Sequence, residues 1–304
     1  MPYIFRMRTV VLATALLLPC ASLATPGSAW RQGWGLARPP ADAAAPAPAP
    51  PARLRLQANG AQWQAYIENT LDGPLEYVLV ASDGQSLTGL PSTGLLPARR
   101  STVIANLPAP ADGGPLRVVL RTAPGDPAAQ PHDVTYALPF ADAPVRVSQP
   151  PQGLASHRDA GNAEAVDFAL PVGTPVLAAR SGTVMQVQDG FAATASDAEG
   201  LLERVNLVRV LHEDGSMAVY AHLRAGAMQV RAGQHVSSGQ PLGHSGNSGL
   251  SRGPHLHFAV QVNRGLQLHA VPVRIATARG ELRFARPAPD TPAAPDPAAR
   301  QGPL

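Results

Sequence analysis

Three kinds of residue are scarce in this sequence, and each scarcity excludes a class of function. Lysine is absent from all 304 residues, which excludes a phosphate-binding P-loop and lysine-based catalysis. Aromatic residues make up only 5%, so no stacking platform for nucleic acid is indicated. Cys20 is the single cysteine, which excludes a disulfide within the chain.

The first 24 residues have the three parts of a secretory signal peptide. Arg6 and Arg8 form a positive region, residues 9–18 are a continuous small and apolar run, and residues 22–24 supply the small side chains that a signal peptidase reads. The run is too short to span a bilayer comfortably, and Pro19 disfavours a lipoprotein signal at Cys20. The sequence therefore predicts a signal peptide at residues 1–24 and export to the periplasm or the outside, with no stable membrane span after cleavage.

Export also changes the charge of the protein. The formal charge of +3 falls to +1 when Arg6 and Arg8 are removed, despite a sequence pI of about 9.5. A nearly neutral mature chain does not indicate nucleic acid or another polyanion as a partner.

Proline and glycine, with 33 and 28 residues, help to divide the chain. An Ala/Pro-rich linker is predicted at residues 25–52 and a disordered Pro-rich tail at 287–304. Short runs of strand formers at 53–57, 75–80 and 116–120, next to turn signals at 83–84 and 112–114, predict a β-sandwich-like domain at 53–143 that positions or supports its neighbour. Residues 144–286 are also strand-rich and hold eight of the nine histidines, so the fold class is all-β and chemistry is expected in this second segment.

One alternating run in the second segment carries two histidines. Its apolar positions are Leu256, Phe258, Val260 and Val262. If these face the core, His255 and His257 project together from the other face and can converge on one ion or one substrate atom. Alone, such a pair is more often two exposed strand histidines.

Two further runs repeat this arrangement. One predicted apolar stripe, Val166, Phe168 and Leu170, leaves Asp167 on the opposite face; a second, Val219, Ala221 and Leu223, leaves Tyr220 and His222 there. A buried carboxylate or imidazole is costly unless it is paired or coordinated. The three runs together therefore indicate a site more strongly than any one of them.

A fourth candidate, His157, lies ten positions before Asp167. A zinc site for hydrolysis needs about three nitrogen or oxygen ligands and one open position. His157, Asp167 and either His255 or His257 supply that number, and the pattern alone leaves open which of the pair takes part.

Other catalytic motifs fit less well. His212-Glu213 lacks the second histidine of the helical H-E-x-x-H zinc site, and residues 243–247 lack the last glycine of a nucleophile elbow. We expect His212 in a hairpin turn, and His235, His244 and His269 at surface or turn positions.

In their residues and their order along the chain, these motifs resemble those of the lysostaphin-like, or LytM-type, zinc peptidases of the M23 family. The matching segments are residues 156–157, 165–171, 173–176, 178–184, 220–223, 246–249 and 253–258. It spans about residues 149–262 and leaves the first domain and the tail uncovered. The resemblance implies a LytM-type antiparallel β-sheet domain, Zn²⁺ as cofactor, and a secreted endopeptidase that hydrolyses peptide cross-links between the peptide stems of bacterial peptidoglycan.

The resemblance also implies a role for each candidate. His157, Asp167 and His257 would hold zinc, and His222 and His255 would be catalytic. Many members of the family place the first histidine and the aspartate four positions apart, whereas the spacing here is ten. A longer spacing between this histidine and the aspartate occurs among relatives with a similar sequence around the aspartate. Residues 158–163 are therefore interpreted as a loop that returns the chain to Asp167.

Two other functions remain open at this stage. Some LytM-type domains are inactive and serve as activators of other wall hydrolases or as wall-binding modules, although these usually lack ligands that are present here. A metallopeptidase that acts on secreted proteins is a third possibility. The sequence does not specify which cross-link bond is cut.

Overall fold

The computed structural model describes residues 48–82, 87–110, 114–153, 157, 159–191 and 204–284, and within these ranges the chain forms strands and turns but no helix. The all-β prediction is therefore confirmed. No helix long and apolar enough to cross a membrane occurs in this part of the chain. The predicted signal peptide and tail, most of the linker, and the turns at 83–84 and 112–113 lie outside the described residues.

Two three-stranded antiparallel sheets form the first group of strands, with the orders β1-β2-β5 and β4-β3-β6. The strands are β1 (Ala52–Asn59), β2 (Gln62–Asn69), β3 (Leu75–Ala81), β4 (Ser92–Leu96), β5 (Ser101–Pro108) and β6 (Val118–Pro124). Alternate side chains of β3 (Leu75, Tyr77 and Leu79) are buried, which is the pattern of a strand with one face on a core. We call this group the sandwich.

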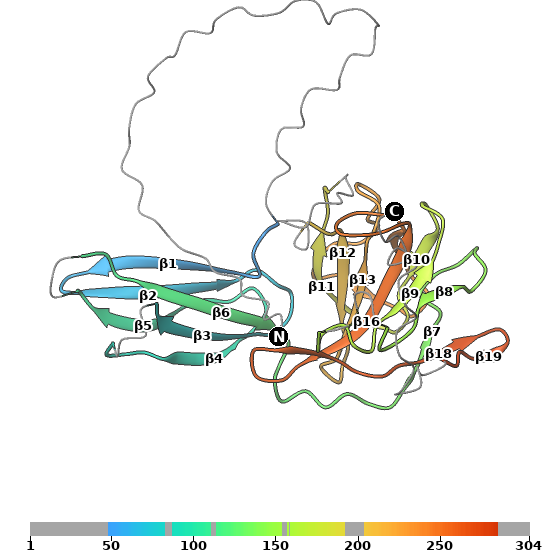
Figure 1. Ribbon diagram of the computed structural model, residues 1–304. Helices are drawn as coiled ribbons and strands as arrows, with labels where there is room; N and C mark the ends of the chain where they lie inside the picture. Colours follow the sequence, from blue (N-terminus) through green and yellow to red (C-terminus); the bar gives the residue numbers. More distant parts are fainter. Residues whose placement is uncertain are drawn as a thin grey trace, which may run out of the picture.

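The second group is built on an eight-stranded sheet with the order β14-β11-β12-β13-β16-β9-β8, in which β17 also pairs with β16. Its strands are β8 (Val147–Gln149), β9 (Val166–Ala169), β11 (Gly182–Gln188), β12 (Leu207–Leu211), β13 (Met217–Ala221), β14 (His235–Val236), β16 (His255–Asn263) and β17 (Leu268–Ala270). The pairing is antiparallel throughout, and β16 lies between β13 and β9 (Figure 1).

Two smaller sheets flank the eight-stranded sheet. One pairs β10 (Pro175–Leu177) with β15 (Pro241–His244). The other has the order β19-β18-β7 and joins β7 (Thr135–Ala137), β18 (Arg274–Thr277) and β19 (Gly280–Glu281). Tyr136 and Phe140 lie in the core of this second group, although both precede the domain boundary predicted at residue 143.

The two groups share a core. Met185 of β11 and Met217 of β13 are fully buried among the apolar side chains of the sandwich. Glu76 of β3 adds polar contacts, because its Oε2 accepts hydrogen bonds from Asn263 Nδ2 at 2.7 Å and from the backbone N of Leu266 at 2.6 Å. The sandwich thus contacts the end of β16, roughly 20 Å from the histidines at its other end, given about 3.3 Å per strand residue.

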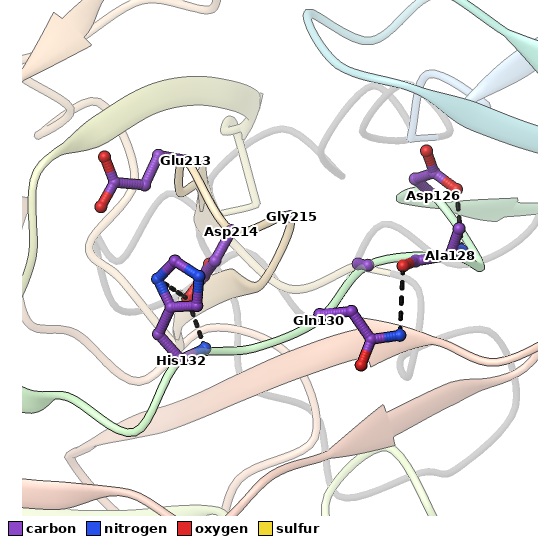
Figure 2. A pocket seen from close by; sticks show the side chains of 8 residues that line it. Asp126, Ala128, Gln130, His132, Glu213, Asp214 and Gly215 are labelled. Carbon is purple, nitrogen blue, oxygen red and sulfur yellow. Dashed lines mark hydrogen bonds and ion pairs between the residues drawn. The ribbon is translucent and has the colours of Figure 1, made fainter.

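The segment between the groups is tied to the β12–β13 hairpin. Asp214 accepts hydrogen bonds from Arg180, from the backbone N of His132 at 2.9 Å and from Ser216. Figure 2 shows His132 over Asp214 in the shallow pocket between this segment and the hairpin. Because these donors occupy the Asp214 carboxylate, it is a structural anchor. The hairpin turn predicted after His212 is confirmed, with Gly215 at a φ of 78°.

Candidate metal centre and catalytic histidines

Three predicted metal ligands converge at one end of the eight-stranded sheet. Asp167 of β9 and His257 of β16 are directly paired, so their side chains leave the same face of the sheet. His157 comes from the segment before β9. Asp167 Oδ1 lies 3.2 Å from His157 Nε2 and 2.9 Å from His257 Nδ1. One potential ligand atom from each residue lies within 4.8 Å of the others, and this is the single such group of three in the described parts of the chain.

The outer ring nitrogens determine which inner nitrogens can bind an ion. His157 Nδ1 lies 3.1 Å from the carbonyl oxygen of Pro150, and His257 Nε2 lies 3.0 Å from Asn162 Oδ1. A carbonyl oxygen only accepts, so each outer nitrogen carries a proton. In a neutral ring the lone pair is then on His157 Nε2 and His257 Nδ1, the two atoms that face Asp167.

Asp167 is the anionic member of the group. Burial by itself raises the pKa of Asp167, but the close contacts of its carboxylate with the rings of His157 and His257 outweigh burial and hold the pKa below its usual range. The side chain is 8% exposed and that of His157 is fully buried. Two imidazole nitrogens and one carboxylate oxygen form the three-ligand set of a catalytic zinc site with an open position. The residues therefore fit zinc.

A second pair of histidines lies beside this group. The ring centroids of His222 and His255 are 4.4 Å apart, and the His222 ring is perpendicular to that of His257 at 6.1 Å. His255 Nε2 lies 4.0 Å from Asp167 Oδ2. The structure thus brings all five predicted site residues together.

Both rings of this pair are oriented by backbone oxygens. His222 Nδ1 lies 2.7 Å from the oxygen of Ser248, and His255 Nδ1 lies 2.8 Å from the oxygen of Gly253. The Nδ1 atoms therefore donate, which leaves the lone pair of each neutral ring on Nε2. Burial, with the charges of His255 and His257, lowers the pKa of His222 to about 3, so this ring is neutral at pH 7.

The face predicted for Tyr220 is wrong. Tyr220 is fully buried in the core and pairs with Phe258, whereas Ala221 pairs with His257 on the site face. Strand β13 ends at Ala221, and His222 follows with a φ of 62°. This left-handed conformation interrupts the alternation of faces, which is why His222 reaches the site although it is two positions after a core residue.

The sequence reasoning missed the residues that hold the rings. Asn162 lies inside the stretch interpreted as a plain loop, and its proximity to His257 has no signal in the spacing. Ser248 and Gly253 lie within the quoted motifs, but they act through backbone oxygens, which any residue type supplies.

The remaining histidines lie outside the cluster. His212 is buried, with Nδ1 at 2.8 Å from the oxygen of Ser181. His235 is exposed on β14, and His244 and His269 are partly exposed on β15 and β17.

Part of the chain matches a known protein family. Residues 161–268 match Peptidase family M23, a stretch that holds Asp167, His222, His255 and His257 and begins after His157. The peptidoglycan DD-endopeptidase ShyA of Vibrio cholerae is 37% identical over 112 residues, which is 37% of this chain and 23% of that protein. An uncharacterized metalloprotease of Haemophilus influenzae is 32% identical over 217 residues, covering 68% of this chain and 40% of the relative.

A solved structure of lysostaphin from Staphylococcus simulans is 35% identical and covers 33% of this chain and 37% of that one, with a TM-score of 0.25. The chain spans 23% and 40% of the lengths of these two curated relatives. The family match covers the segment that carries four of the five convergent residues. Residues 161–268 of this chain therefore belong to peptidase family M23.

Proposed function

We propose that this protein is an exported, zinc-dependent endopeptidase that hydrolyses peptide cross-links of bacterial peptidoglycan. The observation that carries the proposal is the convergence of His157 Nε2, Asp167 Oδ1 and His257 Nδ1 beside a second pair of histidines. The peptidoglycan substrate is supported by the relatives named as peptidoglycan DD-endopeptidase and DD-carboxypeptidase/endopeptidase, and export by the signal-like residues 1–24.

In the proposed reaction His157, Asp167 and His257 hold the zinc ion. The bound ion supplies a Lewis acid that lowers the pKa of a water molecule and polarises the scissile carbonyl. His255 and His222 present lone pairs at Nε2, so either ring can accept the proton of the attacking water. The ring that takes this proton can stabilise the oxyanion and then donate the proton to the leaving amine. The described part of the site thus needs no glutamate base.

The decisive experiment uses the purified mature protein. We expect one zinc ion per chain, cleavage of purified peptidoglycan that a chelator abolishes and added zinc restores, and a new free amine located by mass spectrometry of the fragments. Asp167→Asn is the matched control, because it keeps the side-chain shape but removes the anionic ligand.

Two outcomes would replace the proposal. Stoichiometric zinc without cleavage of any wall fragment would indicate an activator or wall-binding module. Cleavage of a protein substrate but not of wall fragments would indicate a peptidase of secreted proteins.

A further inference from the structure

Asn162 connects the loop between His157 and Asp167 to the proposed metal centre. It is the side chain that faces the outer nitrogen of His257, with Oδ1 at 3.0 Å from Nε2. The outer nitrogen of His157 faces the backbone instead. The loop therefore brings a side-chain acceptor to one of the proposed metal ligands.

The amide of Asn162 is held in one orientation. Its Nδ2 donates to both carboxylate oxygens of Asp159, at 3.0 Å and 2.9 Å. Because a carboxylate only accepts, the nitrogen of the amide must face Asp159 and the oxygen must face His257. Asp159 is itself fixed by a hydrogen bond of 3.0 Å from the backbone N of Gly161. The arrangement is a relay of carboxylate, amide and imidazole.

The loop is anchored to the sheet that carries His257. Gln261 of β16 donates from Nε2 to the oxygen of Gly161 at 2.7 Å, and its Oε1 accepts from the buried Arg209 of β12 at 2.7 Å. The backbone N of Ala270 on β17 donates to the oxygen of Ala160 at 2.7 Å. His257 and Gln261 lie four positions apart on one strand and so share a face. The same strand thus positions the ligand and the loop that contacts it.

We propose that Asn162 is a positioning residue for the metal ligand His257, and that Asp159 holds the Asn162 amide in the orientation this requires. By accepting the Nε2 proton, Asn162 keeps the Nδ1 lone pair of His257 directed at the centre it forms with His157 and Asp167. The inference rests on the metal centre of the proposed function, but it does not depend on which substrate is cut.

Partners of this kind tune metal affinity. Removal of a hydrogen-bond partner from a metal-ligating histidine typically weakens metal binding by about 10–100-fold. We expect a loss in this range for Asn162→Leu, which has similar volume but no acceptor. Asp159→Ala leaves the acceptor in place but frees the amide, so a smaller loss is expected.

The test measures zinc affinity in the full mature chain, by competition with a chromophoric chelator. Glu164→Ala is the matched control, because Glu164 lies in the same loop and bonds to Gln152 rather than to the histidines. Wild type and Glu164→Ala should bind zinc equally, and Asn162→Leu about 10–100-fold more weakly. In the zinc-loaded wild type, the ¹H–¹⁵N signal of His257 Nε2–H should be protected from exchange, and in Asn162→Leu this protection should be lost.

An exchange variant covers the case in which Asn162→Leu does not fold. Asp159→Asn combined with Asn162→Asp reverses the amide and the carboxylate and still offers His257 an acceptor, so zinc affinity should return to within about tenfold of wild type. Equal zinc affinity and equal Nε2–H protection in wild type and Asn162→Leu would overturn the inference, as would an exchange variant that folds but binds zinc no better than Asn162→Leu.

The two proposals fail in different ways. A wild-type chain that binds no zinc contradicts the proposed function itself. A wild-type chain that binds zinc and cleaves its substrate, next to an Asn162→Leu variant of unchanged affinity, contradicts the role of Asn162 alone.

Discussion

His222 offers the sharpest test of the proposed mechanism, because its backbone suggests a substitution that separates chemistry from structure. The residue has a φ of 62°, a conformation in which asparagine is several-fold enriched. An asparagine there can also donate from Nδ2 to the oxygen of Ser248, as His222 Nδ1 does at 2.7 Å. What His222→Asn removes is the Nε2 lone pair that faces the site.

The expected loss follows from this role. Positioned acid–base groups contribute about 10²–10⁴-fold to a rate. At 1.36 kcal/mol for each factor of ten, this is about 2.7–5.4 kcal/mol of transition-state stabilisation. Because burial lowers the pKa of His222 to about 3, the wild-type ring is neutral at pH 7 and the substitution changes no charge in the resting protein.

Single-turnover cleavage of a purified cross-linked peptide fragment provides the rate, and metal analysis of the same samples provides the zinc content. We expect His222→Asn to keep one zinc ion per chain and to lose about 10²–10⁴-fold in rate. His244→Asn, a histidine of β15 outside the cluster, is the matched control and should retain the wild-type rate. A His222→Asn protein that cleaves within about threefold of wild type would refute the catalytic role, and one that no longer binds zinc would indicate a metal ligand instead.

Three further predictions concern stability and can be measured by denaturant unfolding of the metal-free protein. Burial lowers the pKa of His212 from 6.5 to about 4, so between these pH values the unfolded chain binds a proton that the folded chain does not. As the pH drops through this window, the free energy of unfolding should fall by about 3 kcal/mol because of this residue. His212→Gln should remove this part of the pH dependence. Glu76→Ala removes the acceptor of two hydrogen bonds, one from Asn263 of β16 and one from Leu266 in the turn that follows, and should cost about 2–4 kcal/mol without changing zinc affinity. Tyr220→Phe leaves the buried backbone N of Ala179 without the hydroxyl that accepts it at 2.7 Å, and should cost about 1–3 kcal/mol.

Each of these has a contradicting result. If the free energy of unfolding of His212→Gln depends on pH between about 4 and 6.5 as the wild type does, another group takes up the proton. Unfolding of Glu76→Ala at the wild-type midpoint would show that the polar contacts are replaced by water at no cost. Wild-type stability in Tyr220→Phe would mean that the freed amide finds another partner.

The sequence predicts those parts of the site that depend on regular strands. Asp167 and His257 lie opposite apolar stripes, and a strand alternates its faces with a period of two. Because β9 and β16 pair in register, that rule was sufficient to place both side chains on one face. It failed for Tyr220, since the strand ends at Ala221 and the left-handed His222 shifts the alternation by one position.

Features that depend on contacts between distant segments could not be predicted in this way. Met185 and Met217 are ordinary apolar residues of their strands, and only the packing of the sandwich shows that they belong to its core. The loop before Asp167 has no apolar period, so its conformation follows from hydrogen bonds to β16 and β17 that no local pattern encodes. Asn162 was missed for this reason.

The acceptors around the four site histidines suggest why one of them is a side chain. Three of these rings are held at Nδ1 by backbone oxygens, and His257 alone is held at Nε2, by Asn162. A backbone acceptor persists through any substitution that keeps the fold, whereas a side-chain acceptor can be strengthened, weakened or lost by one mutation. In the proposed metal centre His257 would bind through Nδ1, the nitrogen nearest its own backbone, and its outer nitrogen faces Asn162. The loop between His157 and Asp167 supplies the acceptor for that nitrogen through Asn162, so a single substitution in this loop is expected to change how the His257 ring is held.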